Sequence, residues 1–150
     1  MRTARQFLLT ASAALTIVLT ACDYDTPITE NPTRRADSRL LALWRPVAAG
    51  RADETLRIQR FDDMHYVVLY DGDLFLVHHS DAAGLSFVSV RSCGKYAYFA
   101  WDLSEDGKRL TIREVDKDVI PSGTSDVIKL LEMNRNNPHL FEEAFTYARD

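Results

Sequence analysis

Arg60, His65 and His78 are the residues whose types and expected positions best suit binding chemistry. The strand registers given below place these side chains on one inward face, where directly opposed Cβ atoms are about 5 Å apart. Two histidines at that separation could begin a transition-metal site, whereas arginine beside histidine could hold a carboxylate. A solvated polar rim is the favoured alternative, because no third or fourth zinc ligand can be assigned. We therefore predict neither a metal nor a cofactor.

Three aromatic residues, Phe87, Phe99 and Trp101, form a second candidate site. On an inward face they could line a cavity for an apolar ligand. A packed core is the favoured interpretation, because small barrels usually fill themselves with side chains. In the ligand version the cavity would also include Leu56, Ile58, Val67 and Leu76.

No pattern typical of an enzyme occurs in the sequence. It contains no glycine-rich phosphate loop and no HExxH, CxxC or GxSxG motif. No Ser-His-Asp or Cys-His arrangement can be placed on the expected strands. The sequence therefore predicts a protein that is not an enzyme.

The N-terminus has the features of an export signal. Arg2 and Arg5 precede the uncharged stretch Phe7 to Leu19, and small residues follow it up to Cys22. About 20 apolar residues are needed for a membrane-spanning helix, and Asp23 interrupts the stretch before that length is reached. Residues 1–21 are therefore expected to be a signal peptide.

Residues Leu19-Thr20-Ala21-Cys22 resemble the lipobox of bacterial lipoproteins. The resemblance implies cleavage before Cys22, a diacylglyceryl group on its thiol and acylation of its amino group, which together give a stable membrane anchor. The implied location is the cell envelope, with the protein facing the periplasm. In enterobacteria-like lipoproteins an aspartate after the cysteine, here Asp23, implies retention in the inner membrane. Location in the outer membrane is the alternative. Residues 22–38 are polar and lack apolar periodicity, so we expect a flexible tether there.

Charge and cysteine content limit the possible partners. Loss of Arg2 and Arg5 with the signal leaves 16 Lys and Arg against 22 Asp and Glu, a formal charge of −6. Such a chain is unsuited to nucleic acid and permits a basic protein partner. With Cys22 lipidated, Cys93 has no intramolecular partner, and a tolerated turn residue is favoured over a reactive thiol.

From Thr55 to Val115, runs of seven to nine mostly apolar residues alternate with turns. The expected turns are Asp62-Asp63, Asp71-Gly72, Ser80 to Gly84, Ser92-Cys93-Gly94 and Asp106-Gly107. We predict a mainly β fold, an antiparallel up-and-down meander of six or seven strands that closes to a small barrel or half-barrel. Leu40 to Val47 is expected to add a short strand or helical turn.

These turns fix the register of each hairpin. A simple five-residue loop at Ser80 to Gly84 does not fit, so a bulge or a shorter loop is expected there. The predicted pairs are Leu56 with Leu69, Ile58 with Val67, Arg60 with His65, His65 with His78, Val67 with Leu76, Leu69 with Leu74, Leu85 with Trp101, Phe87 with Phe99, Ser89 with Ala97, Trp101 with Ile112 and Leu103 with Leu110. They place Leu85, Phe87, Phe99, Trp101, Leu103, Leu110 and Ile112 on one core face.

Two C-terminal amphipathic helices are expected to cover the sheet. Ser122 to Asp126 provides helix-start residues before Val127, Leu130 and Leu131, and Asn137-Pro138 precedes a stripe of Phe141, Ala144, Phe145 and Ala148. Residues 39–150 are thus predicted to form one β-rich domain.

Ala42-Leu43-Trp44 resembles the Gly-x-Trp motif at the entry of the lipocalin barrel, with alanine in place of glycine. The resemblance covers roughly residues 40 to 150 and implies a lipocalin-like architecture without catalytic residues. The sequence thus predicts a lipid-anchored, non-enzymatic envelope protein that binds an apolar or amphipathic ligand or a protein partner. The alternative is a periplasmic inhibitor or immunity protein against a cell-wall hydrolase.

Overall fold

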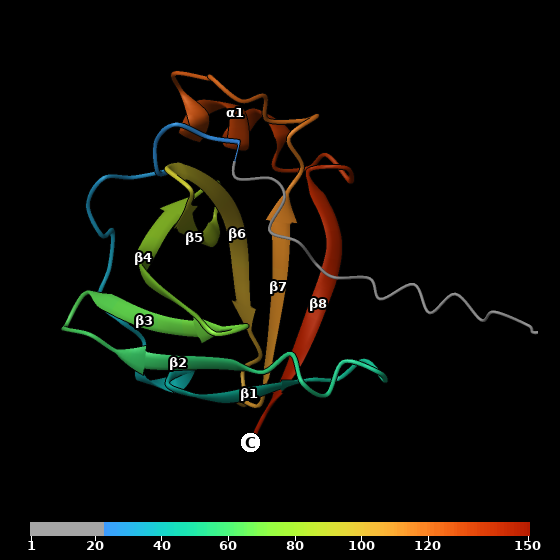
Figure 1. Ribbon diagram of the computed structural model, residues 1–150. Coiled ribbons are helices and arrows are strands. Elements are labelled where there is room, and N and C mark those ends of the chain that lie inside the picture. The colour runs from blue at the N-terminus through green and yellow to red at the C-terminus, as the bar shows by residue number, and fades with distance from the viewer. Residues whose placement is uncertain (1–22) are drawn as a thin grey trace, which may run out of the picture.

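The structure is a computed structural model that describes residues 23–150. The predicted signal peptide, 1–21, and the predicted lipidation site, Cys22, lie outside these residues. Strands and one helix follow each other as in Figure 1. Their bounds are η1 Ser38–Leu40, β1 Ala42–Pro46, β2 Leu56–Arg60, β3 His65–Tyr70, β4 Asp73–Ala82, β5 Leu85–Ser92, β6 Lys95–Leu103, β7 Arg109–Val115, α1 Val127–Asn134 and β8 Phe141–Arg149.

The eight strands form one closed antiparallel barrel. Each strand pairs with the next along the chain, and β1 pairs with β8 through Trp44 and Arg149 to close the circle. The predicted up-and-down meander is confirmed, but with eight strands instead of six or seven, and it closes to a barrel rather than a half-barrel. Closure gives hydrogen-bond partners to strands that would otherwise expose an edge.

The second predicted C-terminal helix is wrong, because residues 141–149 form β8. Phe145 and Tyr147 alternate with more exposed neighbours and pair with Ile112 and Leu110 of β7. The apolar stripe of that segment also fits a helix, but β1 and β7 both need a partner to close the barrel. The ladder hydrogen bonds of closure outweigh the local helical pattern.

The first predicted helix is confirmed as α1. Asp126 caps it, with its Oδ1 accepting a hydrogen bond from the Lys129 amide at 3.1 Å. Val127 and Leu131 are buried. Among residues 23–150 no helix combines the length and the apolar character needed to cross a bilayer.

Two of the predicted registers are confirmed. Around Asp71-Gly72 the structure pairs Leu69 with Leu74 and His65 with His78. At the β6–β7 turn, Leu103 pairs with Leu110 and Trp101 with Ile112.

Two other registers are wrong by one residue. Cys93-Gly94 alone forms the β5–β6 turn, with φ of 49° and 82°, so Ser92 pairs with Lys95 and Phe87 with Ala100. Positive φ at both central positions is the geometry of a type I′ turn. A one-residue slip reverses the face of every side chain. Leu85 and Phe87 therefore lie outside the barrel, whereas Phe99 and Trp101 lie inside.

The β2–β3 connection is longer than the predicted Asp62-Asp63 turn. The Asp62 carboxylate accepts the amides of Met64 and His65 at 2.7 and 2.8 Å, and this side-chain cap adds a residue to the loop. Arg60 therefore pairs with Tyr66, and the predicted pairing of Leu56 with Leu69 and of Ile58 with Val67 is wrong. Leu56, Ile58 and Tyr66 face inward.

The difficulty at Ser80 to Gly84 is resolved by a shorter loop. β4 continues to Ala82, and Ala83-Gly84 forms the turn with φ of 53° and 74°. Ala82 then pairs with Leu85, and His79 with Val88.

The core has two layers. The barrel interior is filled by a cluster that includes Trp44, Leu56, Tyr66, Val88, Trp101 and Leu110. A second cluster lies on the outer side of β5 and β6 and includes Phe87, Tyr98, Ala100, Val127 and Leu131. The helix α1 and an N-terminal segment cover this second cluster (Figure 1).

That N-terminal segment, residues 24–36, is here called the strap. We expected a flexible tether over residues 22–38, but the strap is packed on the barrel. Tyr24 and Ile28 are 3% and 6% exposed, and the Thr33 amide donates to the His79 carbonyl at 2.9 Å. Isolated apolar residues, without periodicity, are enough to bury such a segment when the strands beneath supply the complementary surface.

Candidate functional site

His65 and His78 lie side by side, as predicted, but on the outer surface. Their ring centroids are 5.6 Å apart in an edge-on arrangement. Because of the register change, Arg60 pairs with Tyr66 and its side chain approaches Asp63 at 3.6 Å instead. The structure therefore does not gather the three residues into one inward site. Within residues 23–150, no group of three or more His, Cys, Asp and Glu side chains could hold a metal ion.

His78 connects the strap to the barrel. Its Nε2 donates to the Thr29 carbonyl at 3.0 Å, while the Ile28 amide donates to Ser89 Oγ on β5 at 3.0 Å. The β4–β5 ladder pairs only His79–Ala82 with Leu85–Val88. The strap thus bridges the two strands at the point where their own ladder ends. Burial lowers the pKa of His78, which fits a neutral ring in this structural role.

Phe99 and Trp101 contribute to a small cavity inside the barrel, whereas Phe87 faces outward beneath the strap and α1. The cavity has a volume of about 100 Å³. Ligand sites usually measure about 300–1,000 Å³. The wall is lined by Leu56, Val68, Tyr70, Phe75, Val90, Phe99, Trp101, Ile112, Glu114, Phe145 and Tyr147. The interior is therefore mostly packed core, and Val67 and Leu76 of the predicted lining lie outside it.

Glu114 is the one carboxyl group in the wall of this cavity. Its strand position, opposite Phe99, points inward. Burial, with Glu142 and Asp23 nearby, raises the pKa of Glu114 to about 7. The group is thus partly protonated near neutral pH.

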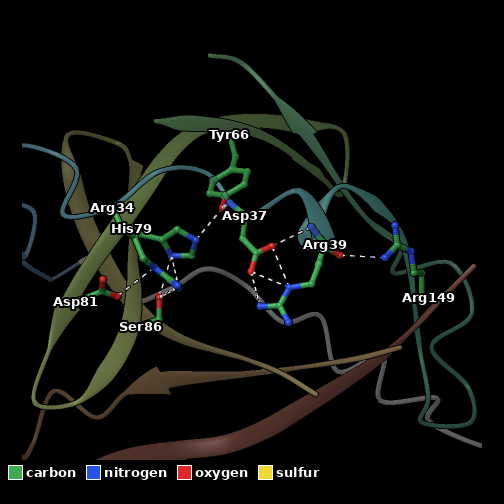
Figure 2. Close-up of polar contacts among 8 residues, drawn as sticks. All are labelled: Arg34, Asp37, Arg39, Tyr66, His79, Asp81, Ser86 and Arg149. Atoms are coloured by element: carbon green, nitrogen blue, oxygen red, sulfur yellow. Dashed lines mark hydrogen bonds and ion pairs between the residues drawn. The ribbon is translucent and has the colours of Figure 1, made fainter. Parts of the chain in front are cut away.

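A polar network lies at one end of the barrel, where η1 packs (Figure 2). His79 is completely buried at its centre. Its Nε2 lies 2.7 Å from the Tyr66 hydroxyl and its Nδ1 lies 2.8 Å from Ser86 Oγ. The Asp37 amide donates to the same Tyr66 hydroxyl. Burial lowers the pKa of His79 to about 4, so the ring is neutral.

His79 Nδ1 has two polar neighbours. Ser86 Oγ lies 2.8 Å from it and Arg34 Nη2 lies 3.4 Å from it. A guanidinium can only donate, so the contact with Arg34 needs a lone pair on Nδ1, whereas a proton on Nδ1 would be donated to Ser86. The two contacts therefore require opposite tautomers of the neutral ring.

Arginine and aspartate pairs surround this network (Figure 2). Arg34 Nη2 donates to Ser86 Oγ at 2.6 Å, and Arg34 Nε lies 3.3 Å from Asp81. Arg39 forms an ion pair with Asp37 at 2.7 Å and holds the pKa of that carboxyl below its usual range. The adjoining depression of about 290 Å³ has Arg34 and Arg39 on its border, each paired with an aspartate, and it is also lined by Arg113, for which residues 23–150 provide no ion pair. The charges of the network itself are therefore paired, while Arg113 leaves one guanidinium at the edge of the depression.

The same end is closed by η1 and Trp44. The Trp44 indole donates to the Leu40 carbonyl at 2.9 Å, and Trp44 is fully buried. Arg149 donates to the carbonyls of Arg39 and Leu41 at 3.1 and 3.2 Å. The last strand thus fixes the turn that plugs the barrel.

Four apolar residues gather on the outer surface of β3 and β4, here called the bare face. Val67 pairs with Leu76 and Leu69 with Leu74, so the four side chains form a contiguous patch. Leu74, Leu76 and Leu69 are 70%, 57% and 37% exposed. Contiguous exposed apolar side chains on a soluble domain typically mark an interaction site.

Arg57 lies beside the bare face. It pairs with Leu69 on one side and with Leu43 on the other, and it is exposed. No acidic side chain of residues 23–150 forms an ion pair with it. The face therefore combines exposed leucines with one available guanidinium.

Sequence reasoning missed the bare face because the register of β2 was off by one residue. It also missed His79, Ser86 and Glu114, whose roles depend on neighbours far away in the chain. His78 and His79 face opposite sides of the sheet, as neighbours on a strand do, and this alternation was the available signal that one of them is buried. Cys93 is exposed in the β5–β6 turn.

Residues 23–150 thus form a closed barrel with a mostly packed interior, a polar network at one end and an exposed apolar face on β3 and β4. The chain matches no protein-family model, no curated protein and no solved structure.

Proposed function

We propose that this chain is a membrane-anchored lipoprotein of the bacterial envelope that is not an enzyme and docks a protein partner on the bare face. The observation that carries the docking proposal is the exposure of Leu74 and Leu76 beside Leu69. The rest of the outer barrel surface with comparable apolar content, over β5 and β6, is covered by the strap and α1.

A protein partner is favoured over a ligand inside the barrel. The interior cavity of about 100 Å³ cannot enclose an acyl chain or another ligand of ordinary size. The lipocalin-like architecture is part of the proposal, supported by Trp44 at the barrel entry. The proposed binding surface is the outside of the barrel, whereas a ligand carrier would bind inside a cavity.

The proposed absence of enzymatic activity is supported by the polar network around His79. Arg34 Nη2 donates to Ser86 Oγ at 2.6 Å, and this hydrogen bond from a cation lowers the nucleophilic character of the hydroxyl.

The partner's surface is expected to present apolar side chains around a carboxylate. Exposed leucines gain free energy when apolar area is removed from water, at roughly 25 cal/mol per Å². Arg57 forms no ion pair, although Asp53 and Asp71 border the same depression, and in such an interface it would lose hydration unless a carboxylate met it. A second copy of this chain is less suitable, because it would bring Arg57 toward another bare face without a carboxylate at its centre.

The anchor is proposed from Leu19 to Cys22, which resemble a lipobox, and the location from the same residues. Asp23 supports retention in the inner membrane. Both points are tested by intact mass of the protein extracted from its own membranes, beside Cys22→Ser. A lipid-sized increment on the N-terminal peptide, absent in Cys22→Ser, is expected, and an unmodified chain would overturn the anchor.

The docking surface is tested by purifying the full-length protein from its membranes in mild detergent. We expect one stoichiometric protein to accompany the wild type and to be lost in Leu74→Arg and in Arg57→Glu. Met133→Arg is the matched control, because Met133 is 71% exposed on α1, close to the 70% of Leu74. Retention in all variants, or loss in Met133→Arg as well, would refute the bare face. Companion lipid instead of protein would favour a ligand carrier.

An inhibitor or immunity protein for a cell-wall hydrolase is the second candidate. The formal charge of −6 after removal of the signal favours a basic partner over a neutral one. In that case acidic loops would make the contact, and the partner would be released by salt and unaffected by Leu74→Arg.

A further inference from the structure

The strap starts from a firmly fixed residue. The amide of Tyr24 donates to the Tyr96 carbonyl at 3.0 Å, and the Tyr96 amide donates back to the Tyr24 carbonyl at 2.7 Å. The Tyr24 ring stacks on Tyr98 with centroids 3.9 Å apart, and its hydroxyl donates to the Ile120 carbonyl at 2.7 Å. Tyr24 is 3% exposed, so the strap cannot detach locally without losing a buried aromatic contact.

Ion pairs flank this fixed point. Asp23 lies 3.6 Å from Lys117, which follows β7, and Asp25 pairs with Lys95 at the start of β6. The Tyr98 hydroxyl donates to the Thr26 carbonyl at 2.7 Å. Every residue from Asp23 to Thr26 therefore contacts the barrel or its β7–β8 connection.

These contacts lie toward one end of the barrel, here called the Gly94 end. It carries the turns Asp71-Gly72 and Cys93-Gly94 and the β7–β8 connection. The opposite end, here called the Gly107 end, carries η1 and the β6–β7 turn. In Figure 1 the strap begins beside the first residues of β6, near α1, and runs along the outside of the barrel to η1.

The chain between the anchor and the fold is too short to act as a spacer. Consecutive Cα atoms are about 3.8 Å apart, and Asp23 is the one residue between the fixed Tyr24 and the proposed anchor, so the linker itself spans no more than about 8 Å. A free tether of the 15 residues from 22 to 36 would instead reach about 20 Å on average.

We propose that the strap holds the barrel directly against the membrane with the Gly94 end toward the lipid. This inference rests on lipidation of Cys22, which belongs to the proposed function. The interaction surface is the bilayer itself, contacted by the β5–β6 turn and the start of the β7–β8 connection. The bare face, whose Leu69 and Leu74 flank the Asp71-Gly72 turn, then lies close to the bilayer.

The test uses Cys93, which lies in the β5–β6 turn and is exposed. The lipidated full-length protein carries a thiol-linked fluorophore on Cys93 and is placed in phosphatidylglycerol and phosphatidylethanolamine vesicles with a spin label on the head group. The comparison variant combines Cys93→Ser with Glu105→Cys, which moves the fluorophore to the Gly107 end. We expect the label on Cys93 to lose most of its fluorescence and the label at position 105 to lose little. Equal quenching at both positions would overturn the proposal.

A linker variant separates the strap from the anchor. Ten Gly and Ser residues between Asp23 and Tyr24 add a reach of about 17 Å while the strap contacts stay intact. Quenching of the Cys93 label should then fall toward that at position 105, and unchanged quenching would show that the strap is not what holds this end down. Mass of the N-terminal peptide is measured on the same samples. A missing lipid identifies failure of the anchor, whereas a present lipid with equal quenching identifies failure of the orientation alone.

Discussion

Two outer faces of the same barrel carry similar apolar side chains, but one face is covered by other parts of the chain and the other is exposed. Over β5 and β6, Phe87, Tyr98 and Ala100 are almost fully buried because the strap and α1 cover them. Over β3 and β4, Leu69, Leu74 and Leu76 stay exposed. The chain therefore has the means to cover an apolar face and uses them on one side only. The first face therefore contributes to the stability of the fold, whereas the second is left in contact with water.

The largest expected effect comes from removing an anchor of the covered face. Tyr24→Ala should lower the free energy of unfolding by about 3–5 kcal/mol, because a buried ring is lost and a cavity remains. Leu76→Ala on the bare face should lower it by less than about 0.5 kcal/mol, because the side chain is already in water. Urea unfolding of both variants measures the difference, and equal losses would show that the two faces do not differ.

The next effect is a pH dependence of stability that is hidden in the wild type, because buried His79 and half-buried Glu114 titrate with opposite consequences. The pKa of His79 is lowered to about 4, so the stability linked to its neutral form is lost as the pH falls from 6.5 to 4. The pKa of Glu114 is raised to about 7, so the stability linked to its protonated form is gained as the pH falls from 7 to 4.5. The two trends oppose each other over most of this range.

Glu114→Gln removes one trend and exposes the other. Its free energy of unfolding should fall by an amount on the order of 3 kcal/mol between pH 7 and pH 4, and by much less in the wild type. Adding His79→Gln should flatten the curve again. If the free energy of unfolding of the double variant still fell steeply between pH 7 and pH 4, a group other than His79 would be responsible.

A smaller effect is expected where the strap bridges β4 and β5. Ser89→Ala leaves the buried Ile28 amide without its acceptor, which should cost about 1–3 kcal/mol. Hydrogen exchange at Ile28 should accelerate more than exchange in β7. Unchanged protection at Ile28 would show that this hydrogen bond does not hold the strap.

The smallest effect on stability is expected from substitutions on the bare face. Leu74→Thr combined with Leu76→Thr should keep the free energy of unfolding within about 0.5 kcal/mol of the wild type. Binding of a fluorescent apolar dye to the folded protein should decrease, because the patch loses its apolar surface. Undiminished dye binding would place the accessible apolar surface elsewhere.

The sequence by itself determined those features that depend on neighbouring residues. Alternating apolar runs and the turn residues predicted an antiparallel meander. The pairs around Asp71-Gly72 were correct because a two-residue turn with positive φ at both positions specifies its own register. The pairs around Asp106-Gly107 were also correct, although the loop there is longer and is closed by the side chains of Ser104 and Asp106. Asp126 and the stripe after it were sufficient for α1. The opposed directions of His78 and His79 follow from the strand period alone.

Only the tertiary structure decided which faces became core. One residue more or less in the turns at Asp62 and Cys93 reversed Val67, Leu76 and Phe87, and no local signal weighs a side-chain cap against a tight turn. Residues 141–149 became a strand because closure of the barrel required a partner for β1 and β7. The strap became ordered because distant strands supplied the surface that buries Tyr24. In each case contacts between residues far apart in the chain outweighed the local preference, and the bare face is the place where no such contact was made.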